Sequence, residues 1–415
     1  MKRLRFTLLL LITVNLFAAS ALEQPPTLKA TAVLGQTPQK GTNYQIEDQV
    51  KNDGYTNTYS IDSTFGTFTA YGNSMLTVRL QEVEGIASLK EVSSSEAFAK
   101  AAAGRVTKPV ESAKKIVEDP KETVKNIPGG VKNKFENLGR WAKKATKKDE
   151  EAIEPEEGEE ETPSESGGTS AAKSILGVTA AHRKWAQQAG VDPYSTNAVL
   201  QDELNRLAKV DAAAGLTVRV AMKDVPGVRT LNRVYDLAWG MDPQELQKLN
   251  EKRLKEMAID PKVSQAFIDN KHLTLTHQTL IIASLLDLNP AQNRTEFLRT
   301  ASKSKSERDA YLYSDSAVMI SSMKKSGQPI TSFLPNPRIA VLRSQNRLIA
   351  VLPADRLYYT KGFSEAVQGF EARNADEIKK ASAKELWLSG TASEKTKAEL
   401  KTRGWTLREN ILSKR

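Results

Sequence analysis

A strongly charged stretch near the middle of the chain limits how the rest of it can fold. Basic and apolar residues interleave from Arg105 to Lys148, and Glu, Pro, Ser and Gly then make up nearly all of residues 154–168. This second part has almost nothing to bury, and it predicts a disordered acidic linker. The linker is the clearest domain boundary in the sequence.

The basic part has the spacing of amphipathic helices. Its apolar residues recur at steps of three or four, apart from one gap at Pro120, which is typical of a single helical face. Prolines 109, 120 and 128 divide it into short helices, because an interior proline removes a hydrogen bond and clashes with the preceding turn. Its candidate residues for binding a membrane or a partner are Lys114, Lys115, Lys121, Lys125, Lys132, Lys134, Phe135, Leu138, Arg140, Trp141, Lys143 and Lys144.

Two interpretations of this basic arm remain open. Its apolar face could pack on the protein's own sheet or helical domain, with the lysines simply solvated. Alternatively, it could lie in an anionic membrane interface, with lysine stems extended and Phe135 and Trp141 at headgroup depth. The acidic linker would then compete for the same lysines. Nucleic acid is not expected as a partner, because aromatic stacking platforms are missing and the chain is predicted to be exported.

The first residues predict that export. Lys2, Arg3 and Arg5 precede or begin a mostly apolar run that ends at Phe17, and Ala19-Ser20-Ala21 provides small residues for a signal peptidase. We therefore expect a cleavable signal peptide over residues 1–21 and a periplasmic protein, peripheral on an envelope membrane. The net charge of +10 falls to +7 once its three basic residues are removed, which favours anionic envelope partners.

Residue types limit the chemistry that the chain can perform. The sequence has no cysteine, so it has no disulfide, thiolate metal site or thiol nucleophile. Of its three histidines, His272 and His277 lie five apart, a spacing that points them away from a common metal. No phosphate-binding loop, dinucleotide-binding motif or Gly-x-Ser-x-Gly motif occurs. We expect no metal and no cofactor, and no catalytic residues are identified.

Two further residue patterns could indicate catalysis, one based on serine and one on paired carboxylates. Ser170 to Lys173, Ser314-Asp315-Ser316 and Lys325-Ser326-Gly327 follow the order of the penicillin-recognising motifs. The middle element lacks its asparagine, however, and Ser170 lies at the edge of the predicted linker, so this hypothesis is set aside. Paired carboxylates for glycoside chemistry can lie anywhere in a chain, and the sequence identifies no such pair. Asp192 and Asp242 are interpreted as helix caps.

The remaining parts of the chain have distinct periodicities. Residues 28–34 and 76–80 alternate in polarity, and turn signals at Asn52-Asp53-Gly54 and Gly72-Asn73 separate apolar runs, which predicts a small antiparallel sheet. Helical spacing dominates from Ser174 to Gly327, with Asp242-Pro243 and Asp260-Pro261 each starting a helix. Asn293 with Glu296 predicts a capping box.

The final ninety residues change period once more. Residues 338–342 and 348–352 predict a hairpin, residues 363–381 a helix, and residues 385–388 and 405–407 two strands. A helix is expected between those strands from Thr391 to Arg403, with Thr391 as its cap and Glu394 at capping-box spacing.

Two stretches resemble uncharacterised exported proteins of Gram-negative bacteria: Gly190-Val191-Asp192-Pro193-Tyr194-Ser195-Thr196-Asn197, and Leu386 to Gly390 continuing to Arg403-Gly404-Trp405. The resemblance covers the helical domain and the C-terminal unit. It implies export and carries no activity or site residue.

The sequence therefore predicts an α+β protein with an N-terminal antiparallel β module, a basic amphipathic helical arm, a helical domain and a small C-terminal α/β unit. The expected divisions are 1–21 (signal peptide), 22–96 (β-rich module), 97–148 (arm), 149–173 (acidic linker), 174–327 (helical domain) and 328–415 (α/β unit). The favoured function is non-enzymatic association with an anionic membrane surface or an envelope protein through the arm. The alternative is a periplasmic hydrolase of an envelope polymer, with its site near the Asp192 to Asn197 loop. That alternative requires a pocket in the 174–327 domain in which carboxylates converge with a histidine, tyrosine or serine.

Overall fold

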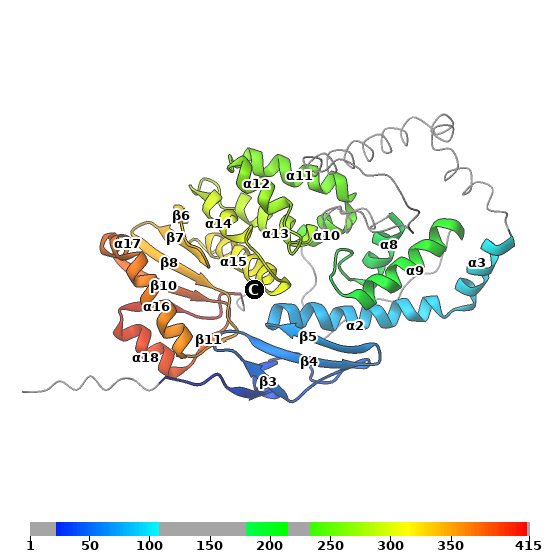
Figure 1. Cartoon of the computed structure of the whole chain (residues 1–415), viewed down its shortest axis with the longest axis horizontal. Helices are drawn as coiled ribbons and strands as arrows, with labels where there is room; N and C mark the ends of the chain where they lie inside the picture. Colours follow the sequence, from blue (N-terminus) through cyan, green and yellow to red (C-terminus); the bar gives the residue numbers. More distant parts are fainter. Residues whose placement is uncertain (1–21, 108–179, 215–232, 413–415) are drawn as a thin grey trace, which may run out of the picture.

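The computed structural model describes residues 22–107, 180–214 and 233–412. They form an α+β fold with an N-terminal antiparallel sheet, a helical middle and a C-terminal mixed sheet (Figure 1). The predicted fold class is confirmed. Among the described residues, the helices are all too short or too polar to cross a membrane.

The N-terminal sheet is antiparallel and packs one face on a long helix. Its strands follow the order β1-β3-β4-β2, and β5 pairs with β4. Alternating residues of β4, such as Tyr59 and Ile61, are fully buried and meet Leu80 and Val83 of the helix. The bounds are β1 Thr27–Lys29, α1 Ala30–Val33, β2 Tyr44–Ile46, β3 Gln49–Asn52, β4 Asn57–Ser63 and β5 Gly66–Tyr71.

Two predicted strands in this region were wrong. Residues 30–33 form the short helix α1 instead of continuing β1, and the stretch around residues 76–80 belongs to helix α2, Asn73–Ser93. Leu76, Leu80 and Val83 are spaced by four and three residues, so the helical pattern was present beside the alternating one. The carboxylate of Asp355 accepts the backbone N–H of Asn73 at 3.0 Å, which satisfies the start of α2 from a distant part of the chain.

The middle of the protein is a set of antiparallel and crossing helices. Asp242 and Asp260 accept backbone N–H groups of the first turns of α11 and α12, as predicted for the two Asp-Pro helix starts. The bounds are α3 Glu96–Thr107, α8 Ala180–Ala189, α9 Ala198–Ala214, α10 Arg233–Gly240, α11 Pro243–Glu256, α12 Pro261–Ile268, α13 Leu275–Leu286, α14 Arg294–Ala301 and α15 Glu307–Lys325.

Three predicted caps are corrected. Asn293 adopts a left-handed conformation (φ 58°), and its side chain accepts no capping hydrogen bond. Thr391 lies in a short strand, and Ser393 caps the following helix by accepting the N–H of Thr396. Asn197 caps α9 through the N–H groups of Val199 and Leu200, whereas Asp192 forms a turn further upstream.

The C-terminal sheet has the order β12-β10-β8-β7-β6 and is covered on both faces. β8, β10 and β12 are parallel, and β6, β7 and β8 are antiparallel, so the predicted 338–352 hairpin is confirmed. The bounds are β6 Ser332–Leu334, β7 Ala340–Ser344, β8 Arg347–Leu352, β9 Arg356–Leu357, α16 Lys361–Arg373, α17 Ala375–Lys380, β10 Ala383–Leu388, β11 Thr391–Ala392, α18 Glu394–Thr402 and β12 Trp405–Arg408.

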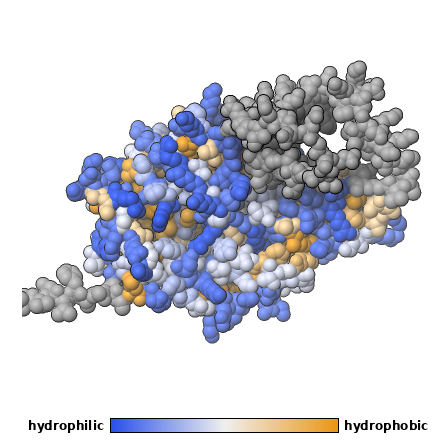
Figure 2. All heavy atoms as spheres, in the orientation of Figure 1, coloured by the Kyte–Doolittle hydropathy of each residue, from blue (hydrophilic) through white to orange (hydrophobic). Residues whose placement is uncertain are grey.

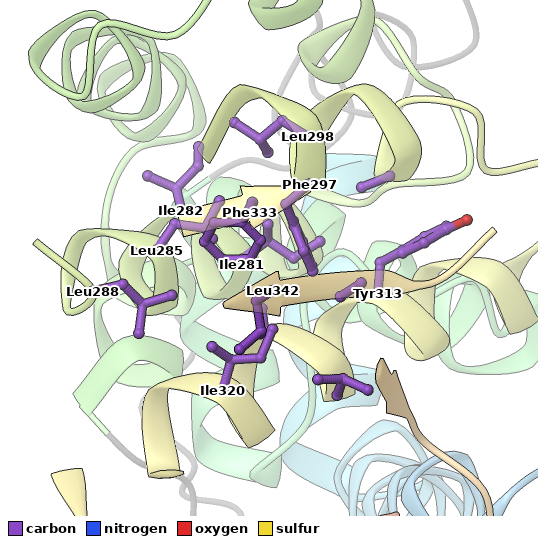
Figure 3. Close-up of a cluster of buried hydrophobic side chains, with 14 of the residues drawn as sticks. Ile281, Ile282, Leu285, Leu288, Phe297, Leu298, Tyr313, Ile320, Phe333 and Leu342 are labelled. Atoms are coloured by element: carbon purple, nitrogen blue, oxygen red, sulfur yellow. The ribbon is translucent and has the colours of Figure 1, made fainter. Parts of the chain in front are cut away.

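The two faces of strand β8 pack into two different hydrophobic cores. Leu348 and Ala350 face α16 and α18, while Ile349 and Val351 face the helical middle, because successive side chains point to opposite faces. Figure 3 shows Ile281, Phe297 and Tyr313 of three helices meeting Phe333 and Leu342 of β6 and β7. The C-terminal sheet and helices α13, α14 and α15 therefore share one hydrophobic core.

The N-terminal and C-terminal parts meet at the loop between β8 and β9. Asp355 in this loop accepts the N–H groups of Asn57 at 2.8 Å and Asn73 at 3.0 Å. A second link starts near the N-terminus. The carboxylate of Glu23 accepts hydrogen bonds from the N–H of Tyr359 and from the hydroxyl of Ser393, both at 2.6 Å. Elements more than 250 residues apart in the sequence are thus joined by hydrogen bonds.

The visible surface is largely hydrophilic (Figure 2). Apolar residues gather most clearly over α2 and the adjoining end of the N-terminal sheet. Only Leu22 and Tyr71 are exposed large hydrophobic residues in the part of the chain that the structure describes.

Candidate functional site

A buried ion pair on α2 forms the base of the candidate site. Arg79 Nη1 lies 2.7 Å from Glu82 Oε2, one helical turn away, and both side chains are buried. Nη2 of Arg79 reaches across to α15 and lies 2.7 Å from both carboxylate oxygens of Glu307. One guanidinium therefore ties α2 to α15, an arrangement that its fork of donors suits.

The loop of residues 190–197 is held against the same helix. Gly85 lets the loop approach, because a Cβ at this position would lie 2.4 Å from Cγ1 of Val191. Gln81 donates to the carbonyl of Gly190. Further along the loop, Ser195 donates to Glu82, and Asn197 Nδ2 donates to the other oxygen of Glu82 at 3.0 Å. The polar side chains of α2 thus determine where this loop lies.

Asp192 is the half-buried carboxyl that this loop positions. Its Oδ1 accepts the N–H of Tyr194 and the hydroxyl of Thr276, both at 2.8 Å. Its Oδ2 accepts no hydrogen bond from a described residue, and Asp192 forms no ion pair with one. Burial raises the pKa of Asp192 to about 7, the charge of Glu82 adds to that shift, and the two hydrogen bonds oppose it.

Helix α15 supplies a second carboxyl at the same junction. Glu307, Tyr311 and Asp315 are spaced by four residues, so they share one face of the helix. Asp315 is half-buried and accepts a hydrogen bond from Ser74 at the start of α2. Burial raises the pKa of Asp315 to about 7, with a further contribution from the charge of Asp355.

The pKa of the Tyr235 phenol on α10 depends on both carboxyls. Burial raises this pKa, and the charges of Asp315 and Asp192 both raise it further. Tyr311 has a similar position, because burial and the charges of Glu82 and Glu307 raise its pKa while Arg79 lowers it. We refer to Glu82, Asp192, Tyr235, Glu307, Tyr311 and Asp315 as the acidic seam.

His277 borders the seam without joining a catalytic arrangement with serine. Its Nδ1 lies 3.0 Å from the hydroxyl of Thr274, and its ring meets Tyr311 edge to face at 5.0 Å. Burial lowers the pKa of His277 to about 4, which keeps the ring neutral near pH 7. The hydroxyl of Ser195 is engaged by other partners, because it accepts a hydrogen bond from the N–H of Asn197 and donates one to Glu82.

The penicillin-recognising pattern is not assembled. Asp315 and Lys325 lie on the same helix ten residues apart, which is roughly 15 Å along the axis at 1.5 Å per residue. Ser170 lies outside the described residues. No group of three or more potential metal ligands gathers within the part of the chain that is described.

The binding residues predicted from the basic arm cannot be placed in the same way. The arm continues from α3, but Lys114, Lys115, Lys121, Lys125, Lys132, Lys134, Phe135, Leu138, Arg140, Trp141, Lys143 and Lys144 all lie outside the described residues. The signal peptide and the acidic linker lie outside them as well.

A shallow groove lies away from the seam, between α3 and α9. Phe98 and Ala102 line one side, Arg206 and Lys209 the other, and the guanidinium of Arg206 covers the Phe98 ring at 5.3 Å. Its lining alternates apolar and charged side chains, and none of the seam residues contributes to it. The seam is the stronger candidate because the carboxyls of Asp192 and Asp315 are half-buried and have raised pKa values.

Sequence reasoning placed only the Asp192 to Asn197 loop near a possible site, and it interpreted Asp192 as a helix cap. Because residues 76–80 were predicted to form a strand, the three-residue spacing of Arg79 and Glu82 was not recognised as one face of a helix. The four-residue spacing of Glu307, Tyr311 and Asp315 was a usable signal, since it places three ionisable groups on one helical face.

Comparisons with known proteins add no further constraint: no family model, no curated protein and no solved structure matches the chain.

Proposed function

We propose that this protein is a periplasmic hydrolase that cleaves an envelope polymer by general acid–base catalysis at the acidic seam. Asp192 and Asp315 are its two catalytic carboxyls. The observations that support this proposal are that both carboxyls are half-buried, that both have raised pKa values, and that neither forms an ion pair with a described residue. The hydrolase hypothesis required a pocket in the 174–327 domain in which carboxylates converge with a histidine, tyrosine or serine, and Asp192, Asp315 and Tyr235 are the residues proposed for it.

The pKa values of the pair suit proton transfer near neutral pH. An ordinary aspartate is almost fully ionised at pH 7 and cannot donate a proton. With pKa values of about 7, the pair carries about one proton at that pH, so one carboxyl acts as acid and the other as base. Oδ1 of Asp192 is fixed by two donors, which leaves Oδ2 as the oxygen that exchanges a proton with substrate.

Arg79 and Glu82 are positioning residues in this scheme. Glu82 is 1% exposed and takes hydrogen bonds from Arg79, Ser195 and Asn197, so its carboxylate is fully engaged. The cluster fixes the loop that carries Asp192, and through Glu307 it fixes the face of α15 that carries Asp315. Catalytic groups need such rigid support, because small displacements reduce the rate strongly.

The proposal is tested with the mature chain, residues 22–415, and a washed envelope fraction from a Gram-negative bacterium. Release of soluble fragments is followed over time. Asp192→Asn and Asp315→Asn are each expected to lower the rate by roughly 10²–10⁴-fold, the usual contribution of a general acid or base. Asparagine at position 192 retains the oxygen that accepts from Tyr194 and Thr276, so the fold is preserved.

Asp260→Asn is the matched control. Asp260 accepts two backbone N–H groups at the start of α12, asparagine caps equally well, and the residue lies outside the seam. This variant is expected to retain full activity. Equal activity of the wild type and the Asp192→Asn/Asp315→Asn double variant would rule out the catalytic role of the seam.

We also propose that the basic arm attaches the protein to an anionic membrane surface. The sequence pattern supports this: apolar residues at helical spacing, interleaved with lysines and arginines between Arg105 and Lys148. Each basic residue near such a surface contributes roughly 1 kcal/mol, and salt screens the attraction. An envelope protein is the other partner that this chemistry would suit.

Sedimentation with liposomes tests the attachment. The mature chain is expected to sediment with phosphatidylglycerol-containing vesicles at low salt and to be released in part by high salt. Removal of residues 105–148 should abolish sedimentation while leaving the circular dichroism of the remaining domains in place. Binding that persists in the deletion variant would move the attachment site elsewhere.

A further inference from the structure

Strand β5 forms an open edge of the N-terminal sheet. It pairs with β4 over Gly66–Tyr71, and no other described strand pairs with it. Its six residues include no charged residue and no proline. The other sheet edges among the described residues are strands of two to four residues, and β1 and β12 end in Lys29 and Arg408. Because proteins protect exposed edges by shortening or charging them, β5 is the edge best suited to accept a further strand.

The backbone of β5 presents unpaired groups at this edge. Gly72, which follows the strand, donates its N–H to the carbonyl of Asn57 at 2.8 Å, so every second residue back from Gly72 bonds to β4. The N–H and C=O groups of Thr67 and Thr69 therefore point away from β4. Both residues are exposed, and neither N–H has a hydrogen-bond partner among the described residues.

The side chains of β5 suit pairing with a second copy of the same strand. In an antiparallel pair with its two-fold axis at Thr69, that residue faces the partner's Thr69. Thr67 then lies opposite the partner's Tyr71, and Phe68 lies opposite the partner's Ala70. A threonine beside an aromatic ring is a favourable cross-strand pair, and a large side chain opposite a small one avoids a collision. Since β5 has no charged residue, this register brings no like charges together within the strand pair.

The surface around β5 adds apolar area to such a contact. Apolar residues gather where α2 adjoins the end of this sheet (Figure 2). Phe65 and Phe68 remain partly exposed, and Tyr71 is 42% exposed. A pair of six-residue strands is only roughly 20 Å long at about 3.4 Å per residue. We therefore expect a smaller contact than in a permanent dimer, with a Kd on the order of 10 μM.

We propose that β5 pairs with β5 of a second copy of this chain and that the two N-terminal sheets join into one continuous sheet. The N–H of Thr69 donates to the carbonyl of the partner's Thr69, and the N–H of Thr67 donates to the carbonyl of the partner's Tyr71. The N–H of Tyr71 lies 3.3 Å from Sδ of Met75, a weak acceptor, and it exchanges this contact for the carbonyl of the partner's Thr67.

Sedimentation velocity of the mature chain, residues 22–415, tests the association. The protein is measured from about 1 to about 200 μM, in high salt that screens attraction through the basic arm. A shift from the mass of one chain to the mass of two is the expected result. A single chain at every concentration would overturn the proposal.

Substitutions at Thr69 test whether β5 is the contact. Thr69→Pro removes the N–H that donates across the two-fold axis and should raise Kd at least about 10-fold. The intrachain sheet does not use this N–H, and circular dichroism confirms that the variant is folded. Association of a folded Thr69→Pro protein with the wild-type Kd would exclude this edge.

A pair of charge variants tests the register. Thr69→Lys and Thr69→Glu each place like charges opposite one another across the two-fold axis, so each should self-associate less tightly than the wild type. An equimolar mixture pairs opposite charges and should associate at least about 5-fold more tightly than either variant alone. Ser60→Lys is the matched control, because Ser60 is the neighbour of Thr69 on β4 and lies one strand away from the edge. Its Kd should match that of the wild type, and a mixture without the gain would contradict the register.

Hydrogen exchange locates the contact directly. Protection of the Thr67 and Thr69 amides should rise with protein concentration, because these groups bond to the partner only in the dimer. Protection that rises elsewhere and leaves β5 unchanged would place the dimer contact on another surface and overturn the proposal.

Discussion

Two regions of the molecule use carboxylates in opposite ways. In the C-terminal sheet, burial alone would raise the pKa of Glu385, but hydrogen bonds from Trp387 and Arg347 and the charges of Arg347 and Arg408 outweigh it and lower the pKa. In the acidic seam, burial raises the pKa values of Asp192 and Asp315 to about 7, and no described cation opposes the shift. Burial alone raises the pKa in both regions, and the neighbouring cations and hydrogen-bond donors decide whether the final pKa lies above or below its ordinary value.

The seam has one strong cation nearby, and it serves other carboxylates. Arg79 is engaged by Glu82 and Glu307, each at 2.7 Å, so it holds the structure together while Asp192 and Asp315 remain unpaired. A protein designed only for stability gains little from such unpaired, desolvated carboxyls. Carboxyls with raised pKa values at the junction of several elements are instead a feature of functional sites.

The largest expected effect comes from removing that cation. Arg79→Met leaves the carboxylate of Glu82 buried without its charged partner, and the expected cost is about 3–5 kcal/mol in the free energy of unfolding. Urea unfolding measures it. The Arg79→Met/Glu82→Gln double variant should lose less than the two single variants added together. Additive losses would show that the two side chains act independently.

The next effect concerns the C-terminal sheet. Glu385→Gln removes the negative charge that Arg347 and Arg408 neutralise, and it weakens the acceptor of the buried Trp387 indole. Because Arg408 is half exposed, we expect a loss of about 2 kcal/mol in unfolding free energy. Asp192→Asn should cost nothing or stabilise the protein, since it removes a desolvated carboxyl. A destabilised Asp192→Asn protein would show that the carboxyl of Asp192, like that of Glu385, stabilises the fold, and it would contradict the difference between the two regions.

The pH dependence of stability should have opposite signs in the two regions. The folded pKa values of Asp192 and Asp315 lie above the ordinary value of 3.8, so stability rises as the pH falls through about 7, by roughly 1–2 kcal/mol for each carboxyl after solvent screening. Lowered pKa values at Glu371 and Glu385 stabilise the fold above the ordinary value of 4.5, and this contribution is lost as the pH falls below it.

Urea unfolding at pH 8, 6, 5 and 4 measures both signs. The Asp192→Asn/Asp315→Asn double variant should lose the rise in stability between pH 8 and 5 but keep the decline below pH 4.5. A double variant with the wild-type profile above pH 5 would contradict the raised pKa values.

The smallest effect is expected at an exposed pair that belongs to neither region. Lys379 and Asp376 lie 3.9 Å apart with side chains 78% and 86% exposed, so solvent screens their attraction. Lys379→Ala should change the free energy of unfolding by less than about 0.5 kcal/mol. A larger change would show that side-chain exposure does not predict how much an ion pair contributes to the free energy of unfolding.

Local signals predicted much of the fold. The two Asp-Pro sequences start α11 and α12, and the strands and helices of residues 338–408 follow their period closely. These features depend on neighbouring residues, because a capping side chain and the helix that it caps are adjacent in the chain. The prediction failed where a distant group decides, as at α2, whose first turn is satisfied by Asp355.

The candidate site was much less predictable than the fold. Its carboxyls come from residues 82, 192, 307 and 315, and helical spacing connects only Glu307 with Asp315. The short motif that sequence reasoning tested around Asp315 gave it a role in serine chemistry. In the fold, its charge and that of Asp192 both raise the pKa of Tyr235.

By itself, the sequence determined the α+β class, the positions of the basic and acidic stretches and the starts of several helices. Each of these depends on composition or on residues a few positions apart. Only the tertiary structure decided which carboxylates receive a cation and which remain protonatable. A pKa depends on burial and on charges brought near by folding, and here those charges come from elements more than a hundred residues apart.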